Sequence, residues 1–408
     1  MGAVPAEFRA DGSMLLVGGT RADELVSRAG DTPLFVYDLG MVDARIARFR
    51  AAFADVELHY AIKANSYAPL LEYVGKRVDG LDVASVGEME LALACGTPAA
   101  RISFAGPGKR DAELAAAIAA GVTINCESEG EGERALAIGR QARVRPKIAV
   151  RVNPDFEIKG SGMRMGGGAK PFGVDAERVP NLVRRIIDAG ADWRGFHIFA
   201  GSQALDAGAL VEAQRATLEL AGALAGDIGA VPPLVNLGGG FGIPYFHGEQ
   251  PLDVERVGNE LKQALSNRHQ LLEKSEFAIE LGRWLVGEAG VYLTRIVDRK
   301  VSHGKTFLVT DGGMHHQLAA SGNFGQVIRR NYPAAIASRM SEAPCEEVSI
   351  VGCLCTPLDR LADDISAPRA AVGDLVAVFM AGAYGLSASP QAFLGHQQAR
   401  EMAVGGRR

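Results

Sequence analysis

Long apolar runs, cysteines and surplus positive charge are all scarce in this sequence of 408 residues, and each shortage excludes a class of protein. No window of about 18 residues is both apolar and uncharged, so we expect no membrane-spanning helix. The first twenty residues carry charges at Glu7, Arg9 and Asp11 and lack the apolar core of a signal peptide. There are 43 Lys and Arg against 48 Asp and Glu, and the resulting net charge of -5 makes nucleic acid and anionic membranes poor partners.

The five cysteines are too few, and odd in number, for a disulfide framework, which favours a reducing, cytoplasmic location. Cys353 and Cys355 stand closer together than a CxxC pair and lack the second ligand pair that a zinc site needs, so we expect no metal centre. Glycine, by contrast, is abundant, with 50 residues or about 12% against a usual share of roughly 7%. Several glycines follow apolar runs, as expected where a strand turns sharply and its backbone approaches a ligand.

Short apolar runs alternate with longer Ala- and Leu-rich stretches from about residue 36 to residue 280. We expect eight strands, over residues 58–62, 80–83, 102–104, 122–125, 147–152, 195–199, 234–237 and 277–280. Helical stretches separate these strands, and this is the pattern of a closed parallel (β/α)8 barrel of the TIM type. An open, doubly wound sheet is the alternative.

The pattern changes after Gly282, where strand-like runs follow one another with few helices between them, over residues 286–296, 300–309, 347–351 and 374–379. We therefore predict an α/β chain in which a barrel is joined to a C-terminal β-sandwich or β-barrel domain. The predicted segments are residues 1–40, an N-terminal segment that joins the β domain, residues 41–285, the barrel, and residues 286–408, the β domain.

The first barrel strand ends in HYAIKAN, in which Lys63 directly follows Ala61 and Ile62. In such a barrel the chemistry lies at the carboxyl ends of the strands. A lysine at the mouth of an apolar strand is partly desolvated, which lowers its pKa and favours the neutral amine that forms a Schiff base. A lysine that merely extends into solvent is the alternative interpretation.

Other strand ends also carry polar groups. The second strand ends in LDVAS, which contains Asp82, and the fifth ends in AVRVNP, which contains Arg151. The seventh strand runs into NLGGGFG, whose glycines could form a backbone cradle for phosphate, although a Rossmann-like loop or a plain turn could have the same sequence. The eighth strand ends in AIELGR, which places Glu280 and Arg283 three residues apart.

Together these motifs resemble those of the barrel-type pyridoxal-phosphate-dependent decarboxylases, the family of diaminopimelate, ornithine and arginine decarboxylases. HYAIKAN resembles the cofactor-lysine motif of that family, NLGGGFG its phosphate loop and ELGR its usual EPGR. Nearer the C-terminus, CTPLD resembles its catalytic-cysteine motif and GAYG its late tyrosine motif. The resemblance implies a decarboxylase that binds pyridoxal 5'-phosphate and works as a head-to-tail homodimer with shared active sites.

The resemblance also implies roles for individual residues. Lys63 would bind the cofactor, Glu280 would pair with its pyridine nitrogen, and Cys355, lent by the partner subunit, would protonate the product carbon. A buried core cysteine is the alternative for Cys355. The implied catalytic residues are Lys63 and Cys355; the cofactor-binding residues are Lys63, Asp82, Arg151, Phe199, Ser202, Gly239, Gly240, Glu280, Arg283 and Tyr384; and the substrate residues are Arg283, Asp311, Thr356, Asp359 and Tyr384.

Three positions depart from the family pattern. Where relatives stack a histidine on the cofactor ring, this chain has Phe199, and we expect His197, two residues earlier, to be a core histidine. Ala319 stands where diaminopimelate decarboxylases have an arginine for the distal carboxylate, and Thr356 stands where relatives have an acidic residue for a distal amine. Without either charged clamp, free diaminopimelate, ornithine and lysine are poor substrates.

These departures predict decarboxylation of an L-amino acid or its conjugate whose far end carries no free charge. The CTPLD and SGNFGQ segments resemble a branch of the family found with antibiotic or exopolysaccharide pathways, in which a glutamyl group on an acyl carrier protein is decarboxylated. Arg329 and Arg330 could meet an acidic carrier, or could be an ordinary solvated pair. The alternatives are a diaminopimelate decarboxylase acting on the free amino acid, a racemase of the same fold, and a non-catalytic paralogue that only binds.

Overall fold

The computed structural model describes residues 1–158, 160, 162–164, 166–326 and 328–406. The chain forms two compact units. The barrel unit consists of Ile46–Ile243 and Pro251–Gly282, and the β unit consists of Met1–Arg45, Pro244–Gln250 and Arg283–Arg408. Residues 244–250 therefore belong to the β unit, although they lie within the predicted barrel segment of residues 41–285.

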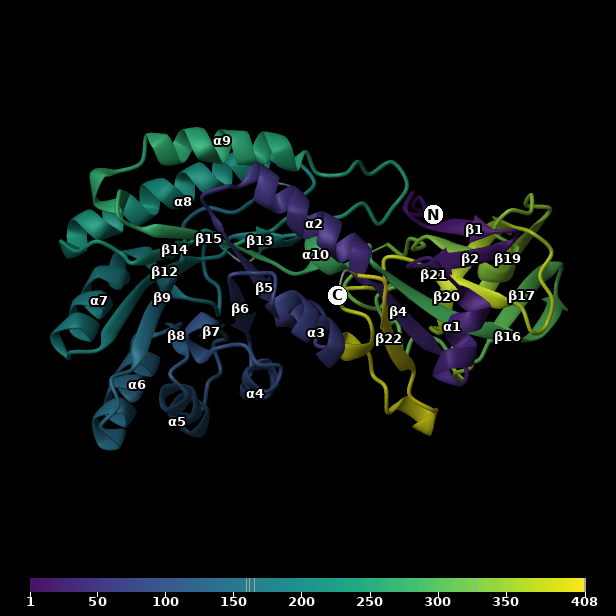
Figure 1. Cartoon of the computed structure of the whole chain (residues 1–408), viewed down its shortest axis with the longest axis horizontal. Helices are drawn as coiled ribbons and strands as arrows, with labels where there is room; N and C mark the ends of the chain where they lie inside the picture. Colours follow the sequence, from purple (N-terminus) through teal and green to yellow (C-terminus); the bar gives the residue numbers. More distant parts are fainter. Residues whose placement is uncertain (159, 161, 165, 327, 407–408) are drawn as a thin grey trace. The chain divides into compact units, whose positions relative to one another are not determined.

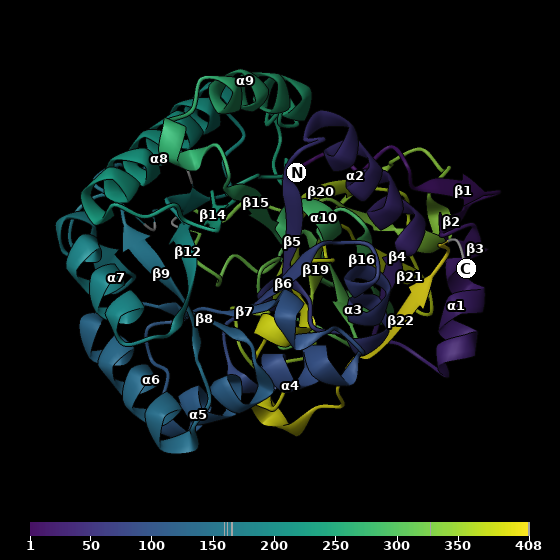
Figure 2. The same ribbon diagram turned by 60° about the vertical axis from the view of Figure 1, so that its left-hand side comes forward.

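The barrel unit is built on eight parallel strands in a closed ring (Figure 2). Around the ring they follow sequence order, and the ring closes through the parallel pairing of β8 with β9. The strands are β5 (Glu57–Ala61), β6 (Gly80–Val83), β7 (Ile102–Phe104), β8 (Thr123–Cys126), β9 (Lys147–Asn153), β12 (Asp192–Ile198), β14 (Leu234–Asn236) and β15 (Glu276–Leu281). The predicted barrel is thus confirmed, and the open sheet is excluded because both of its edges would have to remain unpaired.

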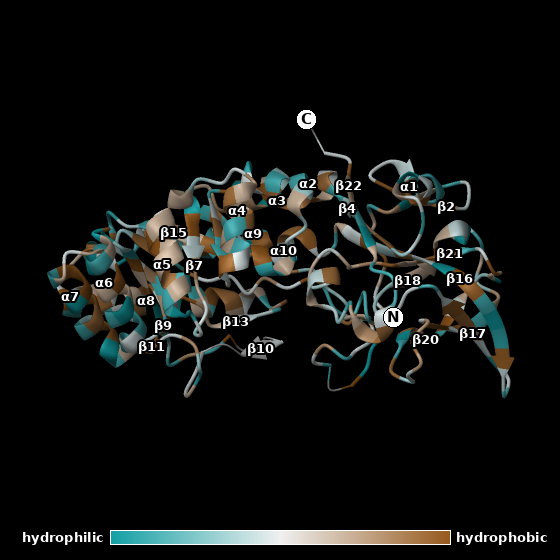
Figure 3. Ribbon diagram, turned by 90° about the horizontal axis from the view of Figure 1, so that it is seen from below, coloured by the Kyte–Doolittle hydropathy of each residue, from teal (hydrophilic) through white to brown (hydrophobic). Residues whose placement is uncertain are grey.

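Helices cover the outside of the ring, and capping residues mark where two of them begin. Ser85 accepts a hydrogen bond from the Glu88 backbone N–H, and Ser128 accepts one from that of Glu131, so each serine caps the helix that follows its strand. Figure 3 shows brown apolar and teal polar faces on helices such as α7. The barrel helices are α3 (Ala68–Gly75), α4 (Val86–Ala94), α5 (Asp111–Ala120), α6 (Glu129–Ala142), α7 (Val179–Asp188), α8 (Ala207–Ile228) and α9 (Val254–Ser266).

Short strands complete the barrel unit. β11 (Val174–Asp175) adds to β9 outside the ring, and β10 (Met163–Arg164) pairs antiparallel with β13 (Gly201–Ser202). Helix α2 (Leu39–Ala52) precedes β5 in the chain (Figure 1).

The β unit contains an eight-stranded sheet with the main order β18-β21-β16-β17-β19-β20. β4 pairs with β16 on one side and with the last strand, β22, on the other. The strands are β4 (Leu34–Asp38), β16 (Gly290–Ser302), β17 (Lys305–Thr310), β18 (Ala334–Ile336), β19 (Glu346–Val351), β20 (Arg360–Ala367), β21 (Leu375–Val378) and β22 (Arg400–Val404). A small sheet of β1 (Arg9–Asp11), β2 (Met14–Val17) and β3 (Thr20–Arg21) and helix α1 (Ala22–Ala29) also lie in this unit.

The β domain was correctly predicted as a class, but its details differ. The strand expected from residue 286 begins at residue 290, because helix α10 (Arg283–Val286) occupies the preceding residues. β20 and β22 were not predicted, since polar and charged residues interrupt their apolar pattern. Across the described residues, none of the helices is both long and apolar enough to cross a lipid bilayer.

Candidate active site

Lys63 lies at the carboxyl end of β5, in the short helical turn Ile62–Ala64. Its Nζ is 3.4 Å from Oε1 of Glu280, which stands near the end of β15, the neighbouring strand. The same Nζ lies 5.3 Å from the ring centroid of Phe199. About half of the lysine side chain is exposed, whereas only 5% of the Glu280 side chain is. The fold therefore brings three predicted site residues together at the mouth of the barrel.

Glu280 is held as an anion despite its burial. Burial alone would raise the pKa of this carboxyl, but the charge of Lys63 and the contact with His197 hold the pKa well below its usual range. Nε2 of His197 lies 3.2 Å from Oε2 of Glu280, and the imidazole is almost completely buried. His197 is thus buried, as expected of a core histidine, but it also contacts a predicted cofactor residue.

The glycine loop after β14 lets three strand ends approach one another closely. A Cβ on Gly239 would lie 1.8 Å from the Glu280 carbonyl oxygen, and a Cβ on Gly240 would lie 2.8 Å from that of Gly201. Gly240 also has a φ of +89°, a conformation that favours glycine. The neighbouring Ser202 is part of β13 and is partly exposed.

Both carboxylate oxygens of Asp82 contact other polar side chains of the barrel. Its Oδ1 accepts a hydrogen bond from Ser103 Oγ at 2.6 Å, and its Oδ2 lies 3.4 Å from Nδ1 of His59. Burial alone would lower the pKa of His59, but the carboxylates of Asp82 and Glu57 raise it to about 10. A Cβ on Gly80 would lie 2.7 Å from the His59 ring, so glycine at this position makes room for the buried imidazole.

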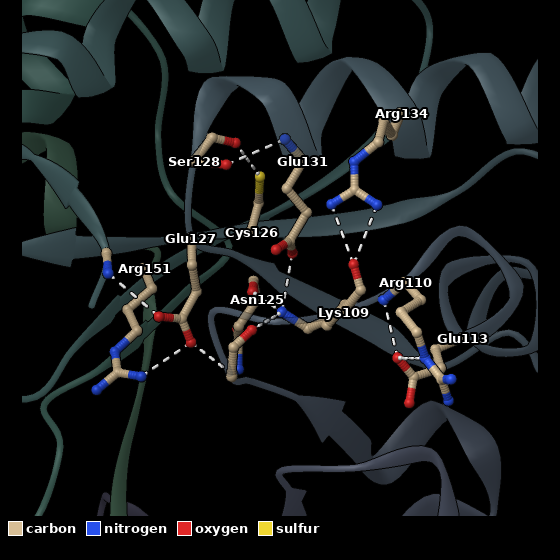
Figure 4. A network of polar contacts seen from close by, with 12 residues as sticks. Lys109, Arg110, Glu113, Asn125, Cys126, Glu127, Ser128, Glu131, Arg134 and Arg151 are labelled. Carbon is tan, nitrogen blue, oxygen red and sulfur yellow. Dashed lines mark hydrogen bonds and ion pairs between the residues drawn. The ribbon is translucent and has the colours of Figure 1, made fainter. Parts of the chain in front are cut away.

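Arg151 forms an ion pair with Glu127, the residue that directly follows β8 (Figure 4). Its Nη1 donates to Glu127 Oε1 at 2.9 Å, and the backbone N–H groups of Gly106 and Gly173 donate to the same carboxylate. Burial would raise the pKa of Glu127, but Arg151 and Lys109 lower it below its usual range. Glu127 therefore ties three loops at the mouth of the barrel to one another.

Lys109 is a buried cation in the same network (Figure 4). Its Nζ donates to Oε1 of Glu131 at 2.8 Å and to the carbonyl oxygens of Gly106 and Asn125 at 2.7 and 3.0 Å. Only 1% of the Lys109 side chain and 2% of the Glu131 side chain are exposed. All three ammonium hydrogens have acceptors, so this lysine stabilises the fold and offers no free amine.

The β unit holds the remaining predicted cofactor residues. The Arg283 guanidinium lies 4.6 Å from the ring centroid of Tyr384, and its Nη1 donates to Tyr245 Oη at 2.8 Å. Nε of Arg283 is buried and has no hydrogen-bond partner among the described residues. A Cβ on Gly382 would lie 1.7 Å from the Val286 carbonyl oxygen, which explains the first glycine of GAYG as a close-packing residue.

Cys355 is exposed and so is not a core cysteine. Asp359, four residues later, is buried, and its two carboxylate oxygens accept hydrogen bonds from the backbone N–H groups of Met314 and Leu354 at 2.6 and 2.8 Å. Thr356 caps the turn between them by accepting from the Leu358 backbone N–H. The carboxylate of Asp359 therefore holds the cysteine loop, and a substrate contact for it stays a prediction.

Asp311 is likewise engaged by its own chain. It accepts hydrogen bonds from the hydroxyls of Thr32 and Thr294 and from the Arg295 backbone N–H. These contacts favour a role in joining β16 to the segment after β17, and its predicted substrate contact also stays a prediction.

The two arginines considered for carrier binding are paired within the β unit. Arg329 forms an ion pair with Asp363 and donates to the Ser321 carbonyl oxygen at 2.9 Å. Arg330 is 3.4 Å from Glu249 and stacks 3.7 Å from the ring of Phe246. These contacts within the chain favour the alternative of an ordinary solvated pair over a surface reserved for a carrier.

Sequence reasoning missed His59, Lys109, Glu127 and the contact made by His197. Glu127 carried a usable signal, because it follows an apolar strand just as Asp82 does. Strand alternation also places His197 and Phe199 on one face. Lys109 lies in a loop, and its burial depends on carbonyl groups that the sequence pattern does not locate.

The chain is similar to known proteins over most of its length. Residues 39–287 match the family model described as the pyridoxal binding domain of pyridoxal-dependent decarboxylases. The chain is 35% identical over 375 residues to the L-glutamyl-[BtrI acyl-carrier protein] decarboxylase of Niallia circulans, covering 90% of this chain and 87% of that protein. It is 31% identical over 393 residues to the diaminopimelate decarboxylase of Methanothermobacter thermautotrophicus, covering 93% and 88%.

Solved structures agree with the fold. The crystal structure of AQ1208 from Aquifex aeolicus superposes with a TM-score of 0.85 at 28% identity, covering 98% of this chain and 93% of that one. Diaminopimelate decarboxylase from M. jannaschii in complex with L-lysine has a TM-score of 0.88 at 24% identity, with the same coverage.

Proposed function

This chain belongs to the pyridoxal-dependent decarboxylase family, and we propose that it decarboxylates an amino-acid group carried as a thioester on an acyl carrier protein. The observation that carries the proposal is the loss of both charged clamps for a free distal group. Ala319, at the expected arginine position, is buried and apolar, and Thr356 replaces the acidic residue after Cys355. A relative at 35% identity is named for a glutamyl group on a carrier protein.

The side chains fit pyridoxal phosphate. Lys63 offers a partly exposed amine for the aldehyde, Glu280 a stabilised carboxylate for the pyridine nitrogen, and Arg283 a buried Nε with no hydrogen-bond partner among the described residues for an anion. When bound, the cofactor supplies an electron sink that accepts the charge left by departing carbon dioxide. Gly239, Gly240, Ser202 and Tyr384 would complete its binding, and Phe199 would stack on the ring.

The chain's own residues then govern binding and proton transfer. Lys63 would hold the cofactor through its amine, and the Glu280 carboxylate would keep the pyridine nitrogen protonated. Cys355 donates a proton to the product carbon, and in our proposal it comes from the second subunit of a homodimer. The Asp359 carboxylate supports that role, since it fixes the backbone on which Cys355 is carried.

A diaminopimelate decarboxylase acting on the free amino acid is the second candidate, favoured by relatives of that name at 31–33% identity. A racemase is disfavoured because its fold-mates pair the pyridine nitrogen with arginine, whereas this chain offers Glu280. A paralogue that only binds is disfavoured because Lys63, the glycine loop and Arg283 are all retained.

The experiment compares release of labelled carbon dioxide from free glutamate, free diaminopimelate and glutamyl-loaded carrier protein by the holoenzyme. We expect turnover of the loaded carrier at least about tenfold above either free amino acid, a difference of about 1.4 kcal/mol in transition-state binding. Lys63→Ala serves as the inactive control. Equal or faster turnover of free diaminopimelate would overturn the carrier proposal and support the second candidate.

A further inference from the structure

His197 is a buried imidazole that lies against the Glu280 carboxylate. It stands on β12 opposite Arg151 of β9 and Asn236 of β14 in the strand register, so it faces the barrel interior. Its Nε2 lies 3.2 Å from Oε2 of Glu280, and the two side chains are 4% and 5% exposed. We propose that His197 is a positioning residue that holds Glu280 as an anion, oriented toward the pyridine nitrogen of the cofactor; this inference rests on the proposed function.

The geometry assigns the two Glu280 oxygens to different partners. Oε1 lies 3.4 Å from Lys63 Nζ, whereas Oε2 is directed to His197. Once Lys63 binds the cofactor its amine would no longer be a free ammonium group, and His197 and Arg151 would be the remaining basic side chains that favour the anionic form of Glu280. A buried carboxylate without a donor would take up a proton and could no longer accept from a pyridinium N–H.

The surroundings of the two ring nitrogens favour one position for the proton of His197. Both nitrogens are buried and neither forms a well-aligned hydrogen bond among the described residues, but Nε2 lies 3.2 Å from a Glu280 oxygen. Placing a hydrogen on Nδ1 would bury an unsatisfied donor, whereas a hydrogen on Nε2 faces the Glu280 carboxylate. In our proposal the hydrogen therefore lies on Nε2, where it points toward the Glu280 carboxylate.

This role explains the departure at Phe199. The family that this chain resembles has a histidine at the position of Phe199. The Phe199 ring centroid lies 6.5 Å from that of His197 in an edge-on arrangement. Phe199 directly follows β12, which ends at Ile198, so the predicted stacking position beyond the strand is apolar, whereas the polar His197 lies within the strand. His197 thus acts on the cofactor through Glu280 and does not itself touch it.

The test measures cofactor affinity of the apoenzyme by absorbance titration across pH. His197→Leu removes the donor, and we expect pyridoxal phosphate to bind about tenfold or more weakly, as for loss of a hydrogen bond to a charged group. The loss should grow as the pH falls from about 8 to about 6, because Glu280 without its donor takes up a proton more readily. His197→Gln, which keeps an N–H near the Nε2 position, should restore most of the affinity and a flat profile.

Phe196→Leu is the matched control, since it removes a buried ring from the opposite face of the same strand. It should lower thermal stability and leave the pH profile of cofactor binding unchanged. An affinity and pH profile for His197→Leu equal to those of the wild type, or matched by Phe196→Leu, would overturn the inference.

Glu280→Gln separates the inference from the proposed function. If Glu280→Gln weakens cofactor binding and His197→Leu does not, the positioning role fails while the site stands. If Glu280→Gln binds the cofactor as the wild type does, the assignment of the pyridine-nitrogen partner fails, and the inference fails with it.

Discussion

Lys109→Met should destabilise the barrel unit by an amount that depends on pH. The methionine leaves the Glu131 carboxylate buried without its cation and leaves the carbonyl oxygens of Gly106 and Asn125 without their donor. Removing one partner of a buried ion pair costs about 3–5 kcal/mol. That is about a fifth or more of the roughly 5–15 kcal/mol by which a folded protein is stable.

The pH dependence follows from Glu131. Burial raises the pKa of this carboxyl even in the presence of Lys109, which lowers it, and loss of Lys109 raises the pKa further. A carboxyl whose pKa is higher in the folded state than in the unfolded state destabilises the fold above that pKa, and the penalty disappears as the pH falls through it. The stability difference between Lys109→Met and the wild type should therefore shrink from about pH 8 to about pH 5.

Urea unfolding followed by tryptophan fluorescence measures this difference. The chain has two tryptophans, and in a Trp284→Phe background the remaining Trp193, on β12, reports on the barrel unit. The double variant Lys109→Met/Glu131→Leu should be more stable than Lys109→Met by at least about 1 kcal/mol, because no lone charge stays buried. A cost below about 1 kcal/mol, or a cost that does not change with pH, would refute the reasoning.

Three further predictions concern the site. Cys355→Ala should keep the absorption band of the bound cofactor but slow product formation by roughly 10²–10⁴-fold, as for loss of a general acid, and unchanged kinetics would remove Cys355 from the mechanism. Gly239→Ala should abolish cofactor binding in the same titration, because its Cβ would lie 1.8 Å from the Glu280 carbonyl oxygen, and wild-type affinity would show that the loop can yield. His59 should contribute stability that is fully present below about pH 6.5 and is lost as the pH rises through about 10, because its pKa is raised in the fold, so His59→Gln should flatten urea stability over that window.

The barrel was predictable because its evidence is local and repeated. Each strand is a short apolar run, helices α4, α6, α8 and α9 begin after a capping serine or aspartate, and the predicted strands at residues 80–83 and 102–104 match β6 and β7. The β unit was predictable only in class, because β20 and β22 carry polar residues along their length and β22 pairs with β4, at the other end of the chain.

The candidate site divides in the same way. Lys63 and Glu280 were found because each follows an apolar strand in a specific motif, and the structure places them 3.4 Å apart. The deeper polar contacts of His59, Lys109 and Glu127 depend on which side chains face one another across the barrel. A linear pattern fixes the alternation along each strand, but it does not fix the register between strands that creates these pairs.

Because β4 pairs with β16 and β22, it cannot form its sheet contacts until the ribosome has made strands far later in the chain. β4 ends at Asp38, but its first partner begins at Gly290, about 250 residues later. At a ribosomal rate of roughly 5–20 residues per second, this strand waits about 12–50 s for its first partner. The intervening residues supply almost the whole barrel unit, so the barrel can close while both edges of β4 are still unpaired. A chaperone that shields extended apolar segments during that interval should therefore raise the yield of folded chain, and its principal target should be the segment LFVYD.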